Sequence, residues 1–169
     1  SVASLFTGVY PHRHGVFEET GPASVLPAAA TTLAEATARV EEALGLPMQP
    51  GGQHEMFGTH NTLMGLADGL YLEAIAIDPQ AVPPTRPRWF DLDRFTGPAR
   101  LSNWICATDD IAAALADLPK GAGHPVSITR GNLRWKMAVP DNGILPYDNM
   151  FPAVIEWQGA VVVWEVMRE

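Results

Sequence analysis

This chain of 169 residues contains a weak internal repeat of predicted elements. A strand, a helix and then about three strands follow one another in each half. In the first half, TTLAEATARVEEALG (31–45) has helical spacing, with Thr31 or Thr32 as N-cap, Glu35 for a capping box and Gly45 as terminator. In the second half, ARLSNWICATDDIAAALADL predicts a strand, a turn and a helix. This weak duplication predicts an α+β fold of two related modules.

A hairpin is the clearest local signal within the first module. Asp68-Gly69 separates two apolar runs, NTLMGLA and LYLEAIAID, which should therefore pair as antiparallel strands. Strand alternation places Glu73 on the same face as Tyr71 and Ile75. A carboxylate on such an apolar face must find a partner or raise its pKa, so Glu73 is a candidate functional residue.

The proline pattern predicts the organisation of the chain. Residues 79–99 are rich in proline and read as a linker between module one (24–78) and module two (100–169). Residues 1–23 read as an irregular N-terminal segment with many turn signals.

Net charge and cysteine content limit the classes of binding partner and of cellular compartment that we expect. The net charge of −8 argues against nucleic acid and anionic membranes. No segment reaches the length of about 18 apolar residues that a membrane span needs. Cys106 is the only cysteine, which favours a reducing compartment, so we expect a soluble cytoplasmic protein.

Several strings carry a family resemblance. GGQHEMFGTHNTLMGLADGLYLEAIAIDP, RWFDLD, WICATDDIAAA and VIEW resemble the glyoxalase-like domains of the vicinal oxygen chelate superfamily over residues 24–157. The resemblance implies paired βαβββ modules whose mixed, curved sheets surround a cleft. In metal-using members the cleft holds a divalent ion that chelates two neighbouring oxygens of a substrate.

The resemblance also implies site residues. Glu73 matches the acid of the first module and Glu156 that of the second, as metal ligands or catalytic bases. The first-strand positions, where the family often has His, are Val25 and Asn103 here, which do not supply good ligands.

His54 and His60, which flank the Gly58 turn, are the additional candidate ligands for Zn, Ni, Mn or Fe, unless no metal is bound. Each candidate has a structural alternative. His60 and Asn61 would instead hydrogen-bond the backbone at a strand entry, and His54 would be exposed. Glu73 would instead form a salt bridge with Arg130 or Arg134.

Aromatic and basic residues predict a ligand pocket. The residues assigned to ligand binding are Trp104, Arg134, Trp135 and Trp157. Arg130 and Arg134 bracket a glycine-containing turn and could clamp a carboxylate or phosphate. The alternatives are core packing for the aromatic residues and solvated surface charge for the arginines.

The first residues carry a different resemblance. SVASLFTGVYPHRHGV (1–16) resembles a fragment of the sulfatase and alkaline phosphatase-like superfamily, downstream of its nucleophile. His12 and His14 are therefore poor catalytic candidates. We expect this segment to have replaced the first strand of the family pattern. If the chain is an inactive remnant, deletion of residues 1–22 should leave stability nearly unchanged, whereas a large loss would show that the segment is part of the sheet.

Three functional hypotheses follow. The first is a metal-dependent lyase, isomerase or dioxygenase that acts on a small oxygen-rich metabolite through a degraded metal site. The second is a metal-free module that sequesters a small molecule. The third is an inactive remnant. By resemblance only, the chain would form a homodimer.

Overall fold

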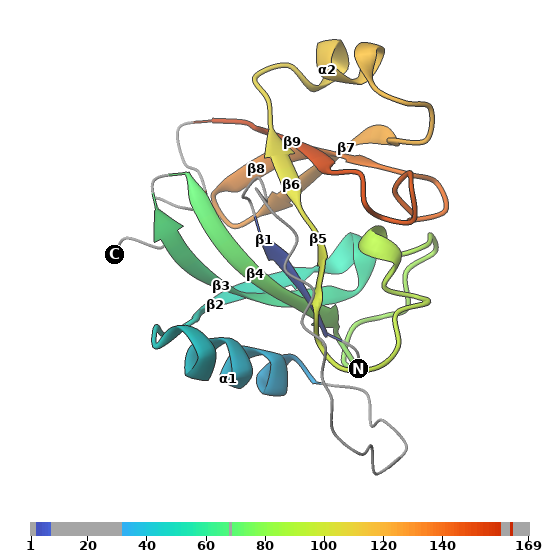
Figure 1. Cartoon of the computed structure of the whole chain (residues 1–169). Helices are drawn as coiled ribbons and strands as arrows, with labels where there is room; N and C mark the ends of the chain where they lie inside the picture. The colour runs from blue at the N-terminus through green and yellow to red at the C-terminus, as the bar shows by residue number, and fades with distance from the viewer. Residues whose placement is uncertain (1–2, 8–31, 68, 160–162, 164–169) are drawn as a thin grey trace.

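The computed structural model describes residues 3–7, 32–67, 69–159 and 163 (Figure 1). The strands and helices are β1 (Ala3–Thr7), α1 (Leu33–Leu44), β2 (Gln49–His54), β3 (Thr59–Ala67), β4 (Leu70–Ile77), β5 (Leu101–Asn103), β6 (Ile105–Ala107), α2 (Ile111–Asp117), β7 (His124–Arg130), β8 (Leu133–Val139) and β9 (Ala153–Trp157). Short 3₁₀ turns cover Glu55–Phe57 and Trp89–Asp91. The fold is α+β, as predicted.

The predicted hairpin and helix signals of module one are confirmed. β3 and β4 pair antiparallel, with Leu63 opposite Glu73. Gly69 takes the left-handed φ of 71° that the turn between them requires. Thr32 caps α1, with Glu35 completing the capping box.

The strands form two sheets. The first has the order β2-β3-β4-β1-β5 and the second the order β6-β9-β8-β7. Within the second sheet β6 runs parallel to β9, whereas the other pairs are antiparallel. The first sheet thus combines β2, β3 and β4 of module one with β1 of the N-terminal segment and β5 of module two, and the second sheet contains the other strands of module two.

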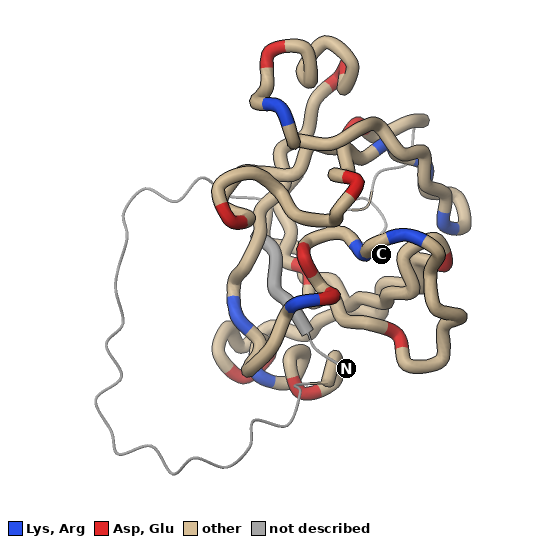
Figure 2. Tube along the Cα trace, turned by 90° about the vertical axis from the view of Figure 1, so that its right-hand side faces the viewer, with Lys and Arg blue, Asp and Glu red and all other residues tan. Residues whose placement is uncertain are grey.

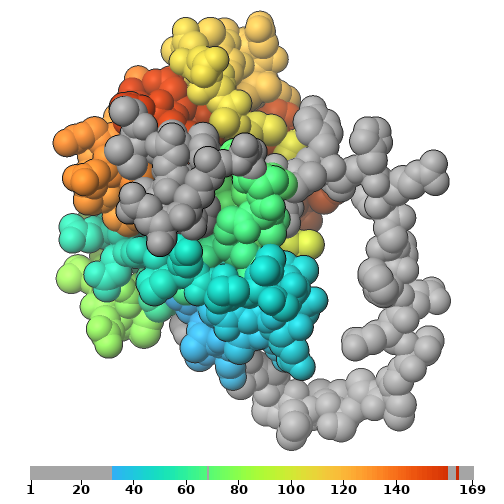
Figure 3. All heavy atoms as spheres, turned by 90° about the vertical axis from the view of Figure 1, so that its left-hand side faces the viewer, coloured from blue at the N-terminus to red at the C-terminus, as the bar shows by residue number. Residues whose placement is uncertain are grey.

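Each helix covers the outer face of one sheet (Figure 1). Ala36 and Val40 of α1 pack against Leu72 and Ala74 of β4. Ile111 of α2 packs in the same way on the second sheet. Seen in space-filling view, the blue and cyan of α1 lie at the opposite end of the molecule from the yellow of α2 (Figure 3). The inner faces of the two sheets are left to form the main core.

The linker contributes to this main core, beyond connecting the modules. Trp89, Phe90, Leu92 and Phe95 are buried in one cluster with residues of both sheets. Trp89 stacks on Phe57 of module one with 4.0 Å between ring centroids. The prolines correctly predicted irregular backbone over 79–99. The aromatic residues within this range fill the space between the sheets.

The prediction of an irregular segment over residues 1–23 is wrong for Ala3–Thr7. This stretch forms β1, which pairs antiparallel with β4 and parallel with β5. The physical reason is that β4 and β5 expose backbone donors and acceptors that an extended segment between them can satisfy. The strand predicted at 24–30, His12 and His14 lie outside the described residues.

Candidate functional site

Glu73 is buried on the inner face of the first sheet. Its exposed fraction is 7%, and it lies on β4 with Ile75. Asn61 Nδ2, from β3, donates a hydrogen bond of 2.6 Å to Glu73 Oε1. Burial raises the pKa of Glu73 to about 7, and the Asn61 hydrogen bond and the charge of Arg130 oppose this rise. The carboxyl group can therefore gain or lose a proton near neutral pH.

A chain of polar contacts links Glu73 to module two. Arg130 Nη1, at the end of β7, donates to Asn61 Oδ1 at 3.1 Å and contacts His54 Nε2 at 3.2 Å. His54 Nδ1 lies 3.1 Å from Thr59 Oγ1. Because an arginine only donates, His54 Nε2 must accept, which places the imidazole hydrogen on Nδ1.

The imidazole of His54 is held neutral. Burial lowers its pKa to about 3, and the charges of Arg130 and His60 act in the same direction. Burial also lowers the pKa of Arg130 and raises that of Tyr71. The network thus combines a neutral imidazole, a guanidinium and a carboxyl group that titrates near pH 7.

Two spaces meet at this network. The inner one is a cavity of about 30 Å³ between the sheets, with room for only a few water molecules. Its wall includes Glu73, Asn61, Tyr71, Trp89, Trp135 and Trp157. The outer one is a groove of about 560 Å³ along β2 and β7. His54 and Arg130 line both spaces and form the boundary between them.

Two neighbouring glycines make room for this network. Gly52 N donates to Asn61 Oδ1 at 2.8 Å. A Cβ at Gly52 would lie 2.6 Å from Arg130 Cδ, and one at Gly51 would collide with Asn61. The Gly-Gly pair in β2 therefore lets the Arg130 side chain reach module one.

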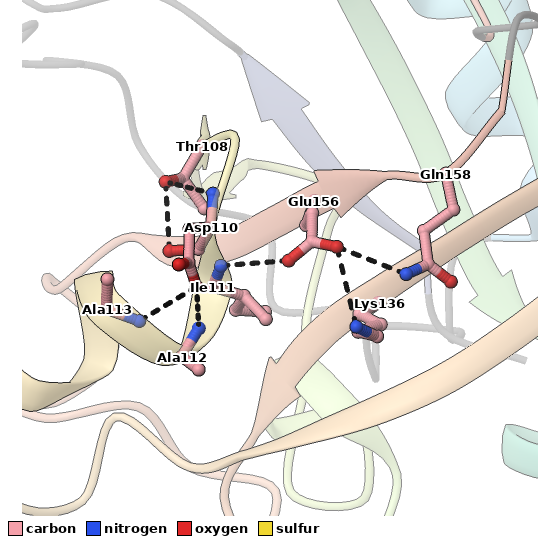
Figure 4. A network of polar contacts seen from close by, with 8 residues as sticks. All are labelled: Thr108, Asp110, Ile111, Ala112, Ala113, Lys136, Glu156 and Gln158. Atoms are coloured by element: carbon pink, nitrogen blue, oxygen red, sulfur yellow. Dashed lines mark hydrogen bonds and ion pairs between the residues drawn. The ribbon is translucent and has the colours of Figure 1, made fainter.

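The structure does not bring Glu156 to the cavity. Glu156 Oε2 accepts from Ile111 N at 2.9 Å, at the start of α2, and Oε1 lies 3.5 Å from Lys136 Nζ and 3.1 Å from Gln158 Nε2 (Figure 4). The Ile111 hydrogen bond, followed by the one from Gln158, lowers the pKa of Glu156. Alternation along β9 instead turns Trp157 inward. The structure therefore does not bring Glu156 together with Glu73.

The two predicted histidines also lie on opposite faces of the first sheet. His54 reaches the network, and with an exposed fraction of 5% it is not on the surface. His60 has the strand parity of Thr62, which hydrogen-bonds Thr37 of α1 at 2.8 Å, so it lies on the helix side of the sheet. His60 is thus excluded from a shared site with Glu73.

A metal-ligand set is not assembled by the predicted residues. Within the described part of the chain, no three His, Cys, Asp or Glu side chains lie close enough to hold an ion. Asn103 is buried and donates to Asn149 O at 3.5 Å. Val25 lies outside the described residues.

Two of the four predicted ligand-binding residues line the cavity. Trp135 and Trp157 lie there, with ring centroids 5.6 Å apart. Trp104 Nε1 donates to Met150 O at 3.0 Å, away from the cavity, and Arg134 is exposed on the outer face. Arg130 takes the central position instead, and the sequence signal for it was the alternation of β7, where Ile128 is also inward.

The geometry defines a two-module α+β protein with a buried carboxyl group between its sheets. A model of the glyoxalase-like domain matches residues 26–167, and the chain belongs to this family, which is part of the vicinal oxygen chelate superfamily. Residues 1–16 lie outside this match. Searches of curated proteins and of solved structures returned no match. None of the helices in the described residues is long and apolar enough to cross a membrane.

Proposed function

We propose that this chain binds a small oxygen-rich molecule in the groove between its modules, beside Arg130, and exchanges a proton with it through Glu73 by way of water in the small inner cavity. The observation that carries the proposal is the buried Glu73 carboxyl group at the cavity wall, with one oxygen held by Asn61 at 2.6 Å. The reaction would be an isomerisation. Glu73 takes a proton from one ligand atom and returns it to another, so the atoms balance without a second reactant.

The surroundings of Glu73 suit proton exchange. A general base works best when its pKa is near the working pH, and burial raises the pKa of Glu73 to about 7. Arg130 shares Asn61 with Glu73 and would stabilise negative charge that develops on the ligand.

The residues present do not fit the expected divalent metal. Of the predicted ligands only Glu73 and His54 reach the network, and Asn61 and Arg130 lie between them. A guanidinium beside the imidazole also repels a second cation. We therefore propose proton exchange by the protein's own groups and derive no step through a metal.

A second candidate function is binding without chemistry. The inner cavity of about 30 Å³ would have to widen to hold such a compound, and the aromatic residues of its wall, among them Trp135 and Trp157, would then favour retention of an apolar or aromatic ligand. This module would sequester its ligand, and Glu73 would only hydrogen-bond it.

Calorimetry with salicylate, which carries two neighbouring oxygen groups, separates these candidates. Binding at pH 7 is measured in two buffers of different ionisation enthalpy, for the natural chain and for Glu73→Gln. We expect the natural chain to take up or release protons on binding and the variant to bind without doing so.

Each other outcome has a defined meaning. Equal proton exchange in both proteins contradicts the role of Glu73, and binding without proton exchange in either supports sequestration. Absence of binding rejects both candidates. Metal analysis is the control, because stoichiometric Zn, Ni, Mn or Fe that is lost in Glu73→Ala would overturn the metal-free form of the proposal.

A further inference from the structure

Arg130 is a partly buried cation that forms no direct ion pair within the described residues, although Glu73 lies close enough to act on it through its charge. Its Nη1 contacts the neutral acceptors Asn61 Oδ1 and His54 Nε2. Within the described residues, no carboxylate forms an ion pair with it, and its Nε and Nη2 have no hydrogen-bond acceptor. Burial of a charge without a direct ion pair is unfavourable, so an anion in direct contact with the guanidinium would stabilise this side chain.

The groove beside Arg130 is large enough for a small ligand. Its volume is about 560 Å³, and it runs between the edge strands β2 and β7. Met56 and Ile128 supply apolar surface, and the hydroxyl groups of Ser127 and Thr129 supply polar surface. Such a combination of apolar walls and a few polar groups is typical of small-molecule sites.

The Arg130 side chain is positioned by contacts with module one and with Trp135. Its arm crosses from module two to module one over Gly52, where a side chain would collide with it. Its guanidinium carbon lies 5.9 Å from the centroid of the Trp135 ring. An arginine fixed by neutral groups keeps its planar fork available for bidentate recognition of an oxyanion.

The charges in the groove select the kind of anion. Arg130 and Glu55 are the charged residues that line it, and Glu55 is exposed. Along the Cα trace, acidic and basic residues occur in the same parts of the chain (Figure 2). One cation with a carboxylate nearby suits a ligand with a single negative charge better than a doubly charged phosphate.

We infer that the groove between β2 and β7 binds a small molecule through its carboxylate group, which pairs with the Arg130 guanidinium. This inference rests on the proposed function, because it names the ligand class of the same site. The remainder of the ligand lies along the groove, and its inner end meets the boundary that His54 and Arg130 form with the Glu73 cavity.

Titration with benzoate, with neutral benzamide as the matched compound, tests the inference. Binding is followed by calorimetry and tryptophan fluorescence for the natural chain, Arg130→Met and Arg134→Met. We expect benzoate to bind more tightly than benzamide and than inorganic phosphate. Its dissociation constant should rise roughly tenfold to a hundredfold in Arg130→Met, since a charge-assisted hydrogen-bond pair is lost. Arg134→Met, on the exposed outer face, should change it less than twofold.

Several results would overturn the inference. These are absence of benzoate binding, equal affinity for benzamide or phosphate, and unchanged benzoate affinity in Arg130→Met. Circular dichroism checks that the variants fold. If Arg130→Met does not, Arg130→Lys decides, because loss of the fork should weaken benzoate binding several-fold and unchanged affinity would contradict the proposal.

Carboxylate recognition and proton exchange can fail separately. Carboxylate recognition is measured as the difference in affinity between benzoate and benzamide, and it depends on Arg130. Proton exchange is measured as the change of the binding enthalpy with the ionisation enthalpy of the buffer, and it depends on Glu73. A loss of benzoate selectivity in Arg130→Met together with unchanged proton exchange in Glu73→Gln would keep the ligand class and reject the proposed reaction.

Discussion

The last strands of the two modules each carry an acid among apolar residues, but Glu73 lies on the inner face of its sheet and Glu156 on the outer face. Glu73 of β4 lies inward, with Asn61 as partner and a pKa raised by burial. Glu156 of β9 lies outward, bonded to Ile111 N, with a lowered pKa. A shift of one residue along a strand exchanges the two faces, so an acid can leave the cavity without any change of fold.

The first strands of the modules differ as well. β6 runs parallel to β9, and three residues separate it from α2. β1 runs antiparallel to β4, and the family match begins only at residue 26, after this strand. The sheet position beside the last strand is therefore filled in module one by a segment outside the family match, in the reverse direction.

Proline substitution in the first strand of each sheet should give the largest difference in the free energy of unfolding. Leu5→Pro removes a backbone donor from β1, which has a neighbour on both sides, whereas Cys106→Pro changes β6 at a sheet edge. We expect Leu5→Pro to lower the free energy of unfolding by about 3 kcal/mol or more, and Cys106→Pro by less. Urea denaturation measures both.

This prediction replaces the expectation that the N-terminal segment can be deleted without effect. If Leu5→Pro lowers the free energy of unfolding no more than Cys106→Pro does, β1 does not contribute to the sheet. Circular dichroism of the two variants provides the control for overall folding.

Substitution of Glu73 should change the pH dependence of stability. Its pKa is raised from 4.5 to about 7, so the folded state holds a proton that the unfolded state releases, and its contribution is lost as pH rises across this range. His54, lowered from 6.5 to about 3, acts in the opposite sense: its contribution is lost as pH falls below 6.5. The two effects oppose each other between pH 4.5 and 6.5.

Glu73→Gln should therefore gain stability relative to the natural chain as pH rises from 4.5 to 7, by up to about 3 kcal/mol. Urea denaturation at pH 5, 6, 7 and 8 measures the gain. His54→Asn should shift the dependence in the opposite direction. Glu156→Gln is the matched control, because hydrogen bonds lower the pKa of Glu156 from 4.5, which keeps its titration out of the range between pH 4.5 and 7. A constant difference between Glu73→Gln and the natural chain would contradict the buried, titrating carboxyl group.

The smallest effect is expected for the outward acid. Glu156→Ala removes the acceptor of Ile111 N at the start of α2 and should slightly lower the melting temperature. Hydrogen exchange at the Ile111 amide should become faster, and Glu156→Gln, which retains an acceptor oxygen, should restore most of the protection. Unchanged exchange in Glu156→Ala would mean that Glu156 does not anchor this helix.

Local patterns in the sequence were sufficient for much of module one. The Asp68-Gly69 pair predicted the hairpin, the Thr32 and Glu35 spacing predicted the capped helix, and alternation predicted the inward position of Glu73. These features depend on residues close together in the chain, so their physical causes can be read directly from the sequence. The same strings also indicated the family.

Tertiary structure decided the composition of the site. The contact of Arg130 with Asn61 and His54 joins residues from different modules. Glu156 was assigned to the site by the family resemblance and His60 by its place beside the Gly58 turn, but the face that each presents depends on register and on the helix that covers the sheet. The inclusion of β1 in the first sheet depends on the backbone groups that β4 and β5 leave open. The sequence thus determined the elements and the buried acid, whereas long-range pairing determined which other residues meet that acid.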